Sequence, residues 1–267
     1  MVPGGDASEL IAVLESPVPS TVRDRQGGGL RLRRDSNGFI SALAARAWRS
    51  GGGVVPGVWL DTLESCRAGD LGFSFWPQQA TPSWAPRLVP DTDDSAVMAL
   101  ELLHAGRLGL PEARRIACLG VAAHRLRQVR RGPVWPRVGM FATWQRAGAR
   151  TDLVDCTVAV NALALLAATG LLGVSGVAET VAAISAGVDW AGADEARLSS
   201  LSPFYPEPDE LRLAVAHAVA AGCTVLAPVA DILGDARLPD PDAAVCSSPY
   251  GLVTWHSREL QAVRAAS

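Results

Sequence analysis

Three carboxylates occupy four successive positions of one short segment, Pro90-Asp91-Thr92-Asp93-Asp94-Ser95-Ala96. The segment leads directly into an apolar run. Because Asp is favoured at helix N-termini, capping alone could explain one or two of these aspartates. It does not explain three, and at least one carboxylate should face an enclosed side, where an unpaired charge is costly. Crowded carboxylates cannot all ionise, so one of them keeps its proton. The arrangement therefore makes Asp93, Asp91 and Asp94 candidate functional residues.

Aromatic residues gather in the connections on both sides of this segment. The chain has eight Trp against two Tyr and five Phe, and the rings that could line a cavity are Trp76, Trp84, Trp135, Phe141, Trp144, Tyr205 and Trp255. The faces of such rings stabilise positive charge. Large rings also plug the ends of helical layers, so we expect only about half of them to face a cavity.

The elements that must position these side chains are expected to be helices. Alanine is the commonest residue, whereas the Thr, Ile and Tyr typical of sheets are scarce. The composition predicts an all-α protein. The expected helices cover residues 8–14, 39–49, 58–67, 92–105, 112–129, 152–169, 174–187, 207–221, 225–233 and 255–265. The triple glycines at 27–29 and 51–53 are expected to form flexible loops.

The expected helices are of two kinds. Residues 95–103 and 154–166 are apolar nearly all round, which a helix tolerates only when it is enclosed on every side. Residues 112–129 carry one apolar stripe and several arginines, as a half-solvated outer helix does. Inner and outer helices together predict an α/α barrel (toroid), possibly incomplete, with an irregular helical solenoid as the alternative. Residues 1–267 are expected to form one such domain, with 1–35 as a partly ordered N-terminal segment.

The composition excludes several classes of function. All 24 basic residues are Arg, so lysine Schiff-base and P-loop chemistry are impossible, and a net charge of −3 disfavours a nucleic-acid partner. No export signal is recognisable in residues 1–9, so we expect a cytoplasmic protein. The uncharged stretch 156–178 is interrupted by Asn161 and by several glycines, so no membrane span is expected.

The Asp91-Thr92-Asp93-Asp94-Ser95-Ala96 segment resembles the Asp-x-Asp-Asp-Thr-Ala signature of class II terpene cyclases of the squalene-hopene type. These enzymes belong to the α/α-toroid superfamily of terpenoid cyclases and protein prenyltransferases. Gly72-Phe73-Ser74-Phe75-Trp76-Pro77, Phe141-Ala142-Thr143-Trp144 and Val154-Asp155-Cys156 support the resemblance, which spans roughly residues 70–260. Only the acidic signature is specific.

The resemblance implies a carbocation mechanism. Asp93 would protonate an alkene or epoxide, with Asp91 and Asp94 hydrogen-bonding around it. Asp155, or a water held by Asn161, would accept the final proton, although Asn161 could equally hydrogen-bond a neighbouring helix. The family usually encloses its substrate between two helical domains, and the repeated Gln-Trp motifs of its triterpene cyclases are missing here. We therefore expect a small prenyl or prenylated substrate, or a homodimer or second subunit that closes the cavity.

Three other readings stay open. A zinc prenyltransferase would need Asp155, Cys156 and His256 as ligands, but adjacent helical residues point roughly 100° apart and the set is incomplete, so we expect no resident metal. Asp91 and Asp94 could share a Mg²⁺ if the substrate is a diphosphate. A non-catalytic carrier of isoprenoid ligands would pair its carboxylates with Arg, whereas an acid catalyst keeps at least one of them free of Arg.

Overall fold

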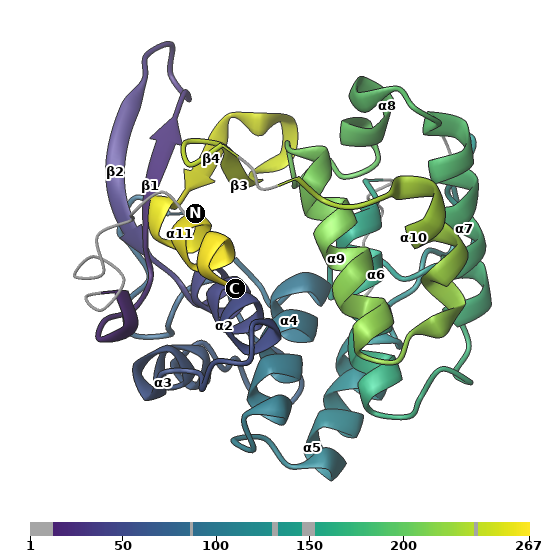
Figure 1. Ribbon diagram of the computed structural model, residues 1–267, viewed down its shortest axis with the longest axis horizontal. Helices are drawn as coiled ribbons and strands as arrows, with labels where there is room; N and C mark the ends of the chain where they lie inside the picture. Colours follow the sequence, from purple (N-terminus) through teal and green to yellow (C-terminus); the bar gives the residue numbers. More distant parts are fainter. Residues whose placement is uncertain (1–12, 86–87, 130–132, 146–152, 238–239) are drawn as a thin grey trace.

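The computed structural model describes residues 13–85, 88–129, 133–145, 153–237 and 240–267, and it combines helices with a four-stranded antiparallel sheet (Figure 1). The strands are β1 (Pro19–Asp24), β2 (Arg31–Ser36), β3 (Ala244–Ser247) and β4 (Val253–His256), in the order β2-β1-β4-β3. The all-α prediction is therefore wrong: the fold is mixed α/β and is not an all-helical toroid.

The sheet joins the two ends of the described chain. β1 and β2 form a hairpin whose turn contains Gly27 and Gly28, both at positive φ (79° and 84°), where the sequence suggested only a flexible loop. β1 also pairs with β4, with Val22 opposite Trp255. The N-terminal segment expected to be partly ordered thus contributes β1 and most of β2, while residues 1–12 lie outside the described part of the chain.

The helices lie close to the predicted ranges. They are α2 (Gly38–Ser50), α3 (Gly57–Ser65), α4 (Thr92–His104), α5 (Leu110–Arg115), α6 (Cys156–Ala168), α7 (Val177–Ala191), α8 (Glu195–Ser200), α9 (Pro208–Ala220), α10 (Ala227–Leu233) and α11 (Arg258–Ala266). α2, α4, α6 and α9 follow one another as packed neighbours, α7 covers α6, and α11 packs on α2 and β1. The short helix α8 was not predicted, and the range 8–14 lies largely outside the described residues.

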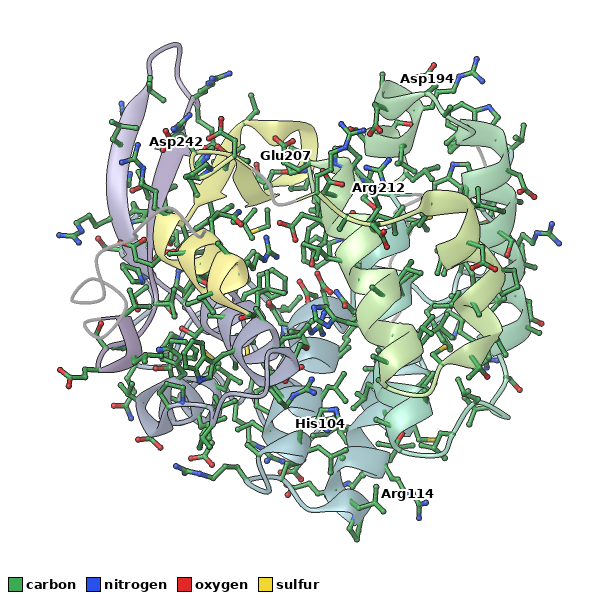
Figure 2. All side chains as sticks on the ribbon, in the orientation of Figure 1. His104, Arg114, Asp194, Glu207, Arg212 and Asp242 are labelled. Atoms are coloured by element: carbon green, nitrogen blue, oxygen red, sulfur yellow. The ribbon has the colours of Figure 1, made fainter. Side chains whose placement is uncertain are left out.

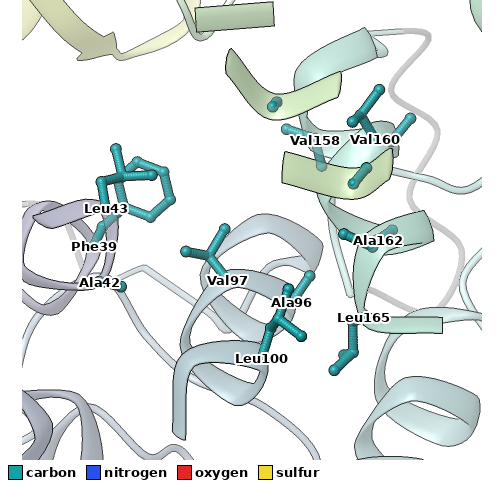
Figure 3. Close-up of a cluster of buried hydrophobic side chains, with 14 of the residues drawn as sticks. Phe39, Ala42, Leu43, Ala96, Val97, Leu100, Val158, Val160, Ala162 and Leu165 are labelled. Atoms are coloured by element: carbon teal, nitrogen blue, oxygen red, sulfur yellow. The ribbon is translucent and has the colours of Figure 1, made fainter. Parts of the chain in front are cut away.

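α4 and α6 are the enclosed helices that the sequence predicted. Ala96, Val97 and Leu100 of α4 lie between side chains of α2 and α6 in the core (Figure 3). All three are at most 2% exposed. A helix buried on both flanks cannot keep a polar stripe, which explains why both sequences are apolar nearly all round.

The predicted outer helix 112–129 is shorter than expected. α5 ends at Arg115 and continues as one π-helical stretch over Ile116–Val121. Within it, Gly120 lies so close to the chain that an added Cβ would stand 2.0 Å from the carbonyl oxygen of Leu71. This close approach requires glycine at that position. The residues that follow form a bridge between Arg125 and Phe141 in place of further helix.

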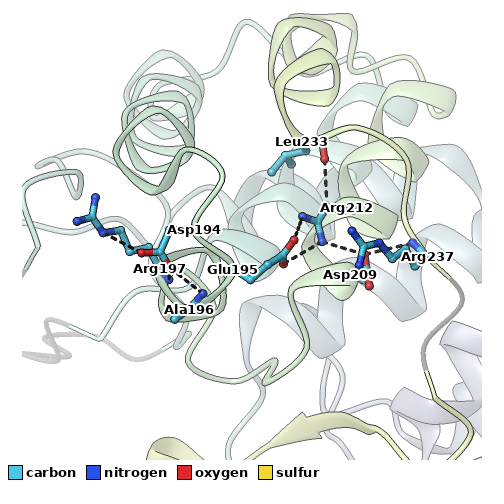
Figure 4. Close-up of polar contacts among 8 residues, drawn as sticks. All are labelled: Asp194, Glu195, Ala196, Arg197, Asp209, Arg212, Leu233 and Arg237. Atoms are coloured by element: carbon cyan, nitrogen blue, oxygen red, sulfur yellow. Dashed lines mark hydrogen bonds and ion pairs between the residues drawn. The ribbon is translucent and has the colours of Figure 1, made fainter.

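Charged side chains tie the outer elements together. Arg212 of α9 pairs with Glu195 of α8 at 2.8 Å and with Asp209 at 2.9 Å, and it donates to the carbonyl oxygen of Leu233 at the end of α10 (Figure 4). Other polar residues, such as Arg114, Asp194 and Asp242, lie at the periphery of the molecule (Figure 2). Among the described residues, no helix is long and apolar enough to cross a membrane.

Candidate acid site

The acidic segment forms the first turn of α4. Asp91 is the N-cap: its Oδ1 accepts a hydrogen bond from the backbone N–H of Asp94 at 2.7 Å. Its backbone also forms a bridge with Trp144, which brings that ring beside the helix end. One aspartate thus caps the helix, as the capping explanation requires, while Asp93 and Asp94 stand in the first turn and line a cavity.

Asp93 is held by two side-chain donors from other elements. Its Oδ1 accepts from Nδ2 of Asn161 on α6 at 2.8 Å, and its Oδ2 accepts a very short hydrogen bond from the hydroxyl of Tyr205. Asn161 in turn accepts from Nη1 of Arg46 on α2 at 2.8 Å. The alternative in which Asn161 bonds a neighbouring helix is therefore confirmed, and its two partners come from α4 and α2.

Opposing effects act on the acidity of Asp93. Burial raises its pKa above the ordinary value, while the hydrogen bonds from Tyr205 and Asn161 and the charge of Arg46 pull the pKa down. Burial thus favours the protonated form of Asp93, and the two hydrogen bonds and the arginine favour its conjugate base. Its conjugate base, once formed, is stabilised by two donors and by the helix N-terminus. A proton-donating catalyst needs both properties.

The charge of Asp93 acts in turn on the two neighbouring aspartates. Burial, followed by the charge of Asp93, raises the pKa of Asp91 to about 8, and burial with the charges of Asp91 and Asp93 raises the pKa of Asp94 well above its usual range. None of the ion pairs between described residues includes any of these three carboxylates. The three carboxylates are therefore without an arginine ion pair among the described residues.

The three carboxylates line a cavity of about 150 Å³, together with seven aromatic residues. Its aromatic lining residues are Phe39, Phe75, Trp76, Trp144, Phe204, Tyr205 and Trp255. The Phe75 ring meets Trp76 at 4.8 Å and Trp255 at 5.1 Å, both edge to face, so the rings support one another. Four of the seven rings proposed from the sequence line the cavity, in line with the expectation that about half would.

The other three proposed rings lie elsewhere in the core. Trp84 meets Trp76 edge to face at 6.0 Å and lies under the Arg33 guanidinium, and it is not among the described lining residues. Trp135 is 1% exposed and packs against Gly187 of α7. Phe141 is buried, and its N–H donates to Thr180. These rings fill space between elements.

Asp155 caps α6 and is fully engaged there. Its Oδ1 accepts from the N–H of Val158 at 3.0 Å and its Oδ2 from the N–H of Phe204 at 2.9 Å. The second bond fixes the loop that carries Tyr205 toward Asp93. Asp155 thus positions the partner of the acid, and among the described residues it does not line the cavity.

Asp155 gives stability an expected dependence on pH. Burial raises its pKa to about 7 against the two backbone hydrogen bonds. Because the folded carboxyl then binds its proton more tightly than the unfolded one, its contribution is complete below about pH 4 and is lost as the pH rises through 7. Asp155→Asn should flatten the decline of unfolding free energy over this window, measured by urea unfolding at several pH values. The exposed cap variant Asp194→Asn should keep the wild-type slope, and an unchanged slope in Asp155→Asn would contradict the assignment.

Asp35 is a site residue that the sequence did not reveal. It lies on β2, is 7% exposed, and accepts the indole N–H of Trp76 at 3.0 Å and that of Trp255 at 2.9 Å. Asn37 also donates to it, at 3.0 Å. A single carboxylate thus orients two rings of the cavity wall. A buried indole N–H needs a hydrogen-bond acceptor, so the sequence could have suggested that such an acceptor exists. It could not show that the acceptor is Asp35.

Replacing Asp35 should loosen this wall. In Asp35→Asn one oxygen is lost, and the new amide N–H₂ faces an indole donor, so we expect unfolding free energy to fall by about 2 kcal/mol. In the same variant, the Trp fluorescence emission should shift to longer wavelength, because water reaches the loosened indole rings. Asp70→Asn, at a surface pair with Arg115, is the matched control and should change neither reading. Wild-type stability in Asp35→Asn would refute the anchoring role.

Two of the three donors weighed for a zinc ion are engaged within the protein. Asp155 caps α6, and His256 on β4 hydrogen-bonds the carbonyl oxygen of Asp242 and the hydroxyl of Thr254, each at 2.8 Å. In the described part of the chain no group of three His, Cys, Asp or Glu residues is arranged to hold a metal ion. A Mg²⁺ shared by Asp91 and Asp94 would have to displace the capping hydrogen bond of Asp91.

Comparison with known proteins adds no relative to this description. Neither the scan against protein-family models nor the searches of curated proteins and of solved structures found a match to this chain.

Proposed function

We propose that this protein is a small Brønsted-acid cyclase of the class II terpene cyclase type. Asp93 protonates an alkene or epoxide of a prenyl or prenylated substrate, and the resulting carbocation cyclises. The observation that carries the proposal is the setting of Asp93: buried, without an arginine ion pair among the described residues, and hydrogen-bonded by Tyr205 and Asn161 at an aromatic cavity.

The first step transfers one proton. Each oxygen of Asp93 already accepts one hydrogen bond, and a carboxyl has further lone pairs to carry the acidic proton toward the cavity. On transfer, the O–H bond breaks, a C–H bond forms at one alkene carbon, and positive charge appears on its neighbour. The negative charge left on Asp93 is stabilised by its two donors.

The cation is then held by the ring faces. Trp76, Trp255 and Phe75 offer π-systems to positive charge at the wall of the cavity. The hydrogen bonds from both indoles to the Asp35 carboxyl group push electron density into the rings and strengthen this effect. Attack by a second double bond closes a ring, and loss of a proton to a cavity water ends a net isomerisation.

Size limits the substrate. An engineered protein cavity of about 150 Å³ holds a benzene-sized guest. The present cavity has the same volume, so it suits a short prenyl substrate more than a long polyene. A second copy or another subunit would extend the enclosure for longer substrates. We also propose a cytoplasmic location, which the five free cysteines support.

The alternative of a non-catalytic isoprenoid carrier is less well supported. A carrier gains nothing from burying three carboxylates beside its ligand, since each burial without an arginine partner costs free energy. The small cavity is compatible with either function.

Deuterium incorporation tests the proposal directly. The protein is incubated in D₂O with geranyl, farnesyl and related prenylated compounds, and the products are analysed by mass spectrometry. We expect a cyclised product carrying one deuterium at the protonated carbon, because the carboxyl proton of Asp93 exchanges with solvent. Cyclised product without deuterium, or no product from any compound, would overturn the proposal.

A further inference from the structure

The turn of the β1–β2 hairpin projects beyond the body of the protein and exposes large apolar side chains (Figure 1). Leu30 and Leu32 are 58% and 64% exposed. Leu252, which is 47% exposed, lies beside the turn, because its carbonyl oxygen accepts the backbone N–H of Arg25 at 2.9 Å. Three leucines thus stand in water at one corner of the sheet. Exposed apolar side chains that are grouped in this way mark an interaction surface.

The same hairpin is rich in arginine. Its strands and turn contain Arg23, Arg25, Arg31, Arg33 and Arg34. Arg33 pairs with Asp24 at 3.9 Å. Arg31 stands opposite Asp24 in the ladder but forms no ion pair with it. Arg25, Arg31 and Arg34 are exposed, and none of the three takes part in an ion pair between described residues.

The other acidic side chains near the hairpin are engaged elsewhere. Asp35 is buried and accepts two indole N–H groups of the cavity wall. Asp242, whose pKa is lowered by Arg258 and in smaller part by Arg23, accepts two hydrogen bonds from Arg258, of 2.7 and 2.9 Å. Two further acidic residues act on that same arginine, Asp240 and Glu259. The three exposed arginines of the hairpin therefore stay uncompensated, although the whole chain has a net charge of −3.

The strand register places apolar and cationic side chains on one outer face. Leu32 pairs with Arg23, and Arg34 pairs with Thr21. Paired residues of antiparallel strands share a face, and so do residues two positions apart. Val22, one position along, is fully buried on the opposite face. We refer to the exposed residues at this end of the sheet as the hairpin patch: Arg25, Leu30, Arg31, Leu32, Arg34 and Leu252.

The chemistry of the hairpin patch discriminates between partners. A second copy of this chain would bring the arginines of two β2 edge strands against one another, which is unfavourable. An acidic protein or a nucleic acid would pair the arginines and leave the leucines in water. A bilayer with anionic headgroups offers phosphates to the guanidinium groups and an apolar boundary layer to the leucines. The aliphatic stem of an arginine can lie in that boundary while its charge stays at the phosphates.

We propose that the hairpin patch binds the surface of an anionic lipid bilayer, with its three leucines below the headgroups and its three arginines at the lipid phosphates. The rest of the chain is net negative and faces away from such a surface. Ser248 and Pro249, which line the acid cavity, closely precede Leu252, so binding brings this part of the cavity wall toward the lipid. The proposal concerns binding alone and does not rest on the proposed cyclase reaction.

Sedimentation with lipid vesicles tests the proposal on the full chain. One set of vesicles is pure phosphatidylcholine, and the other is phosphatidylcholine mixed with phosphatidylglycerol. We expect partitioning to the mixed vesicles to be at least about tenfold stronger, and to weaken as NaCl is added. Arg31→Gln combined with Arg34→Gln should weaken it by about tenfold or more. Leu30→Ser combined with Leu32→Ser should weaken it by about tenfold, through the lost apolar burial.

A matched control removes one exposed arginine and one exposed leucine far from the hairpin. Arg115 ends α5 and is 53% exposed, and Leu119 in the π-helical stretch after it is 52% exposed (Figure 1). Arg115→Gln combined with Leu119→Ser should bind the mixed vesicles as the wild type does. Circular dichroism verifies that each variant is folded.

The wild-type comparison decides the matter even if a variant fails to fold. Equal partitioning to both kinds of vesicle, or no partitioning to either, would overturn the proposal. Undiminished binding by the folded arginine variant would place the contact elsewhere and would overturn it as well. Undiminished binding by the folded leucine variant would show that the arginines act alone, as they would on an acidic protein or a nucleic acid, and would overturn the assignment to lipid.

Discussion

Asp93→Asn is expected to lose cyclised product, with kcat falling by about 10²–10⁴-fold, the usual contribution of a general acid. The amide keeps the size of the carboxyl and can still accept a hydrogen bond, but it carries no acidic proton. Neither neighbour replaces it, because Asp91 is held as the cap of α4 and Asp94 has no donor among the described side chains to stabilise its anion. The measurement is product formation from the prenylated panel, by gas chromatography and mass spectrometry.

Two controls separate lost chemistry from lost structure. The surface variant Asp70→Asn should turn over at the wild-type rate. The melting temperature of Asp93→Asn should stay close to that of the wild type, because the Tyr205 hydroxyl can accept from the new amide N–H₂ while Asn161 donates to the remaining oxygen. Wild-type turnover by Asp93→Asn would defeat the Brønsted-acid mechanism.

Glu101→Gln is expected to be the most destabilising conservative change, lowering the free energy of unfolding by about 3–5 kcal/mol. Glu101 is 1% exposed and binds Arg46 and Arg49 of α2 from its place on α4. The neutral amide would leave the buried Arg46 charge without its counter-ion. Urea unfolding followed by circular dichroism measures the change.

The surface pair of Glu64 with Arg107 provides the matched comparison. Glu64 is 42% exposed and meets the guanidinium at 3.3 Å, so Glu64→Gln should change the unfolding free energy by about 0.5 kcal/mol or less. If Glu101→Gln lowered the unfolding free energy as little as Glu64→Gln, the buried ion pairs of Glu101 would contribute no more to stability than the exposed pair of Glu64.

The helices could be predicted because their signals are local. Asp91 and Asp155 cap α4 and α6, and the apolar runs behind them identify enclosed helices. The strands lack such signals. β2 reads Arg-Leu-Arg-Arg-Asp-Ser, in which only Asp35 is buried, so no alternating apolar face is present. It is a strand because β1 pairs with it, and no local pattern reports that partner.

The candidate site divides in the same way. The three aspartates could be identified because they crowd into the single segment 91–94. The rings of Trp76, Trp144, Tyr205 and Trp255 could be proposed because they are aromatic. Asp35 could not, since its function depends on two indoles from distant parts of the chain. The bond between Arg46 and Asn161 likewise joins positions 115 residues apart.

The pairing of β1 with β4 determines when during synthesis the site can first exist. Trp255 and its acceptor Asp35 are 220 residues apart, so a ribosome must release nearly the whole described chain before the cavity wall can close. Contacts of such long range are slow to form, and until then the cavity wall lacks Trp255. A nascent or truncated chain without β4 contains the three aspartates but lacks Trp255 in the wall beside them. The environment that sets the acidity of Asp93 is therefore complete only after the sheet has formed.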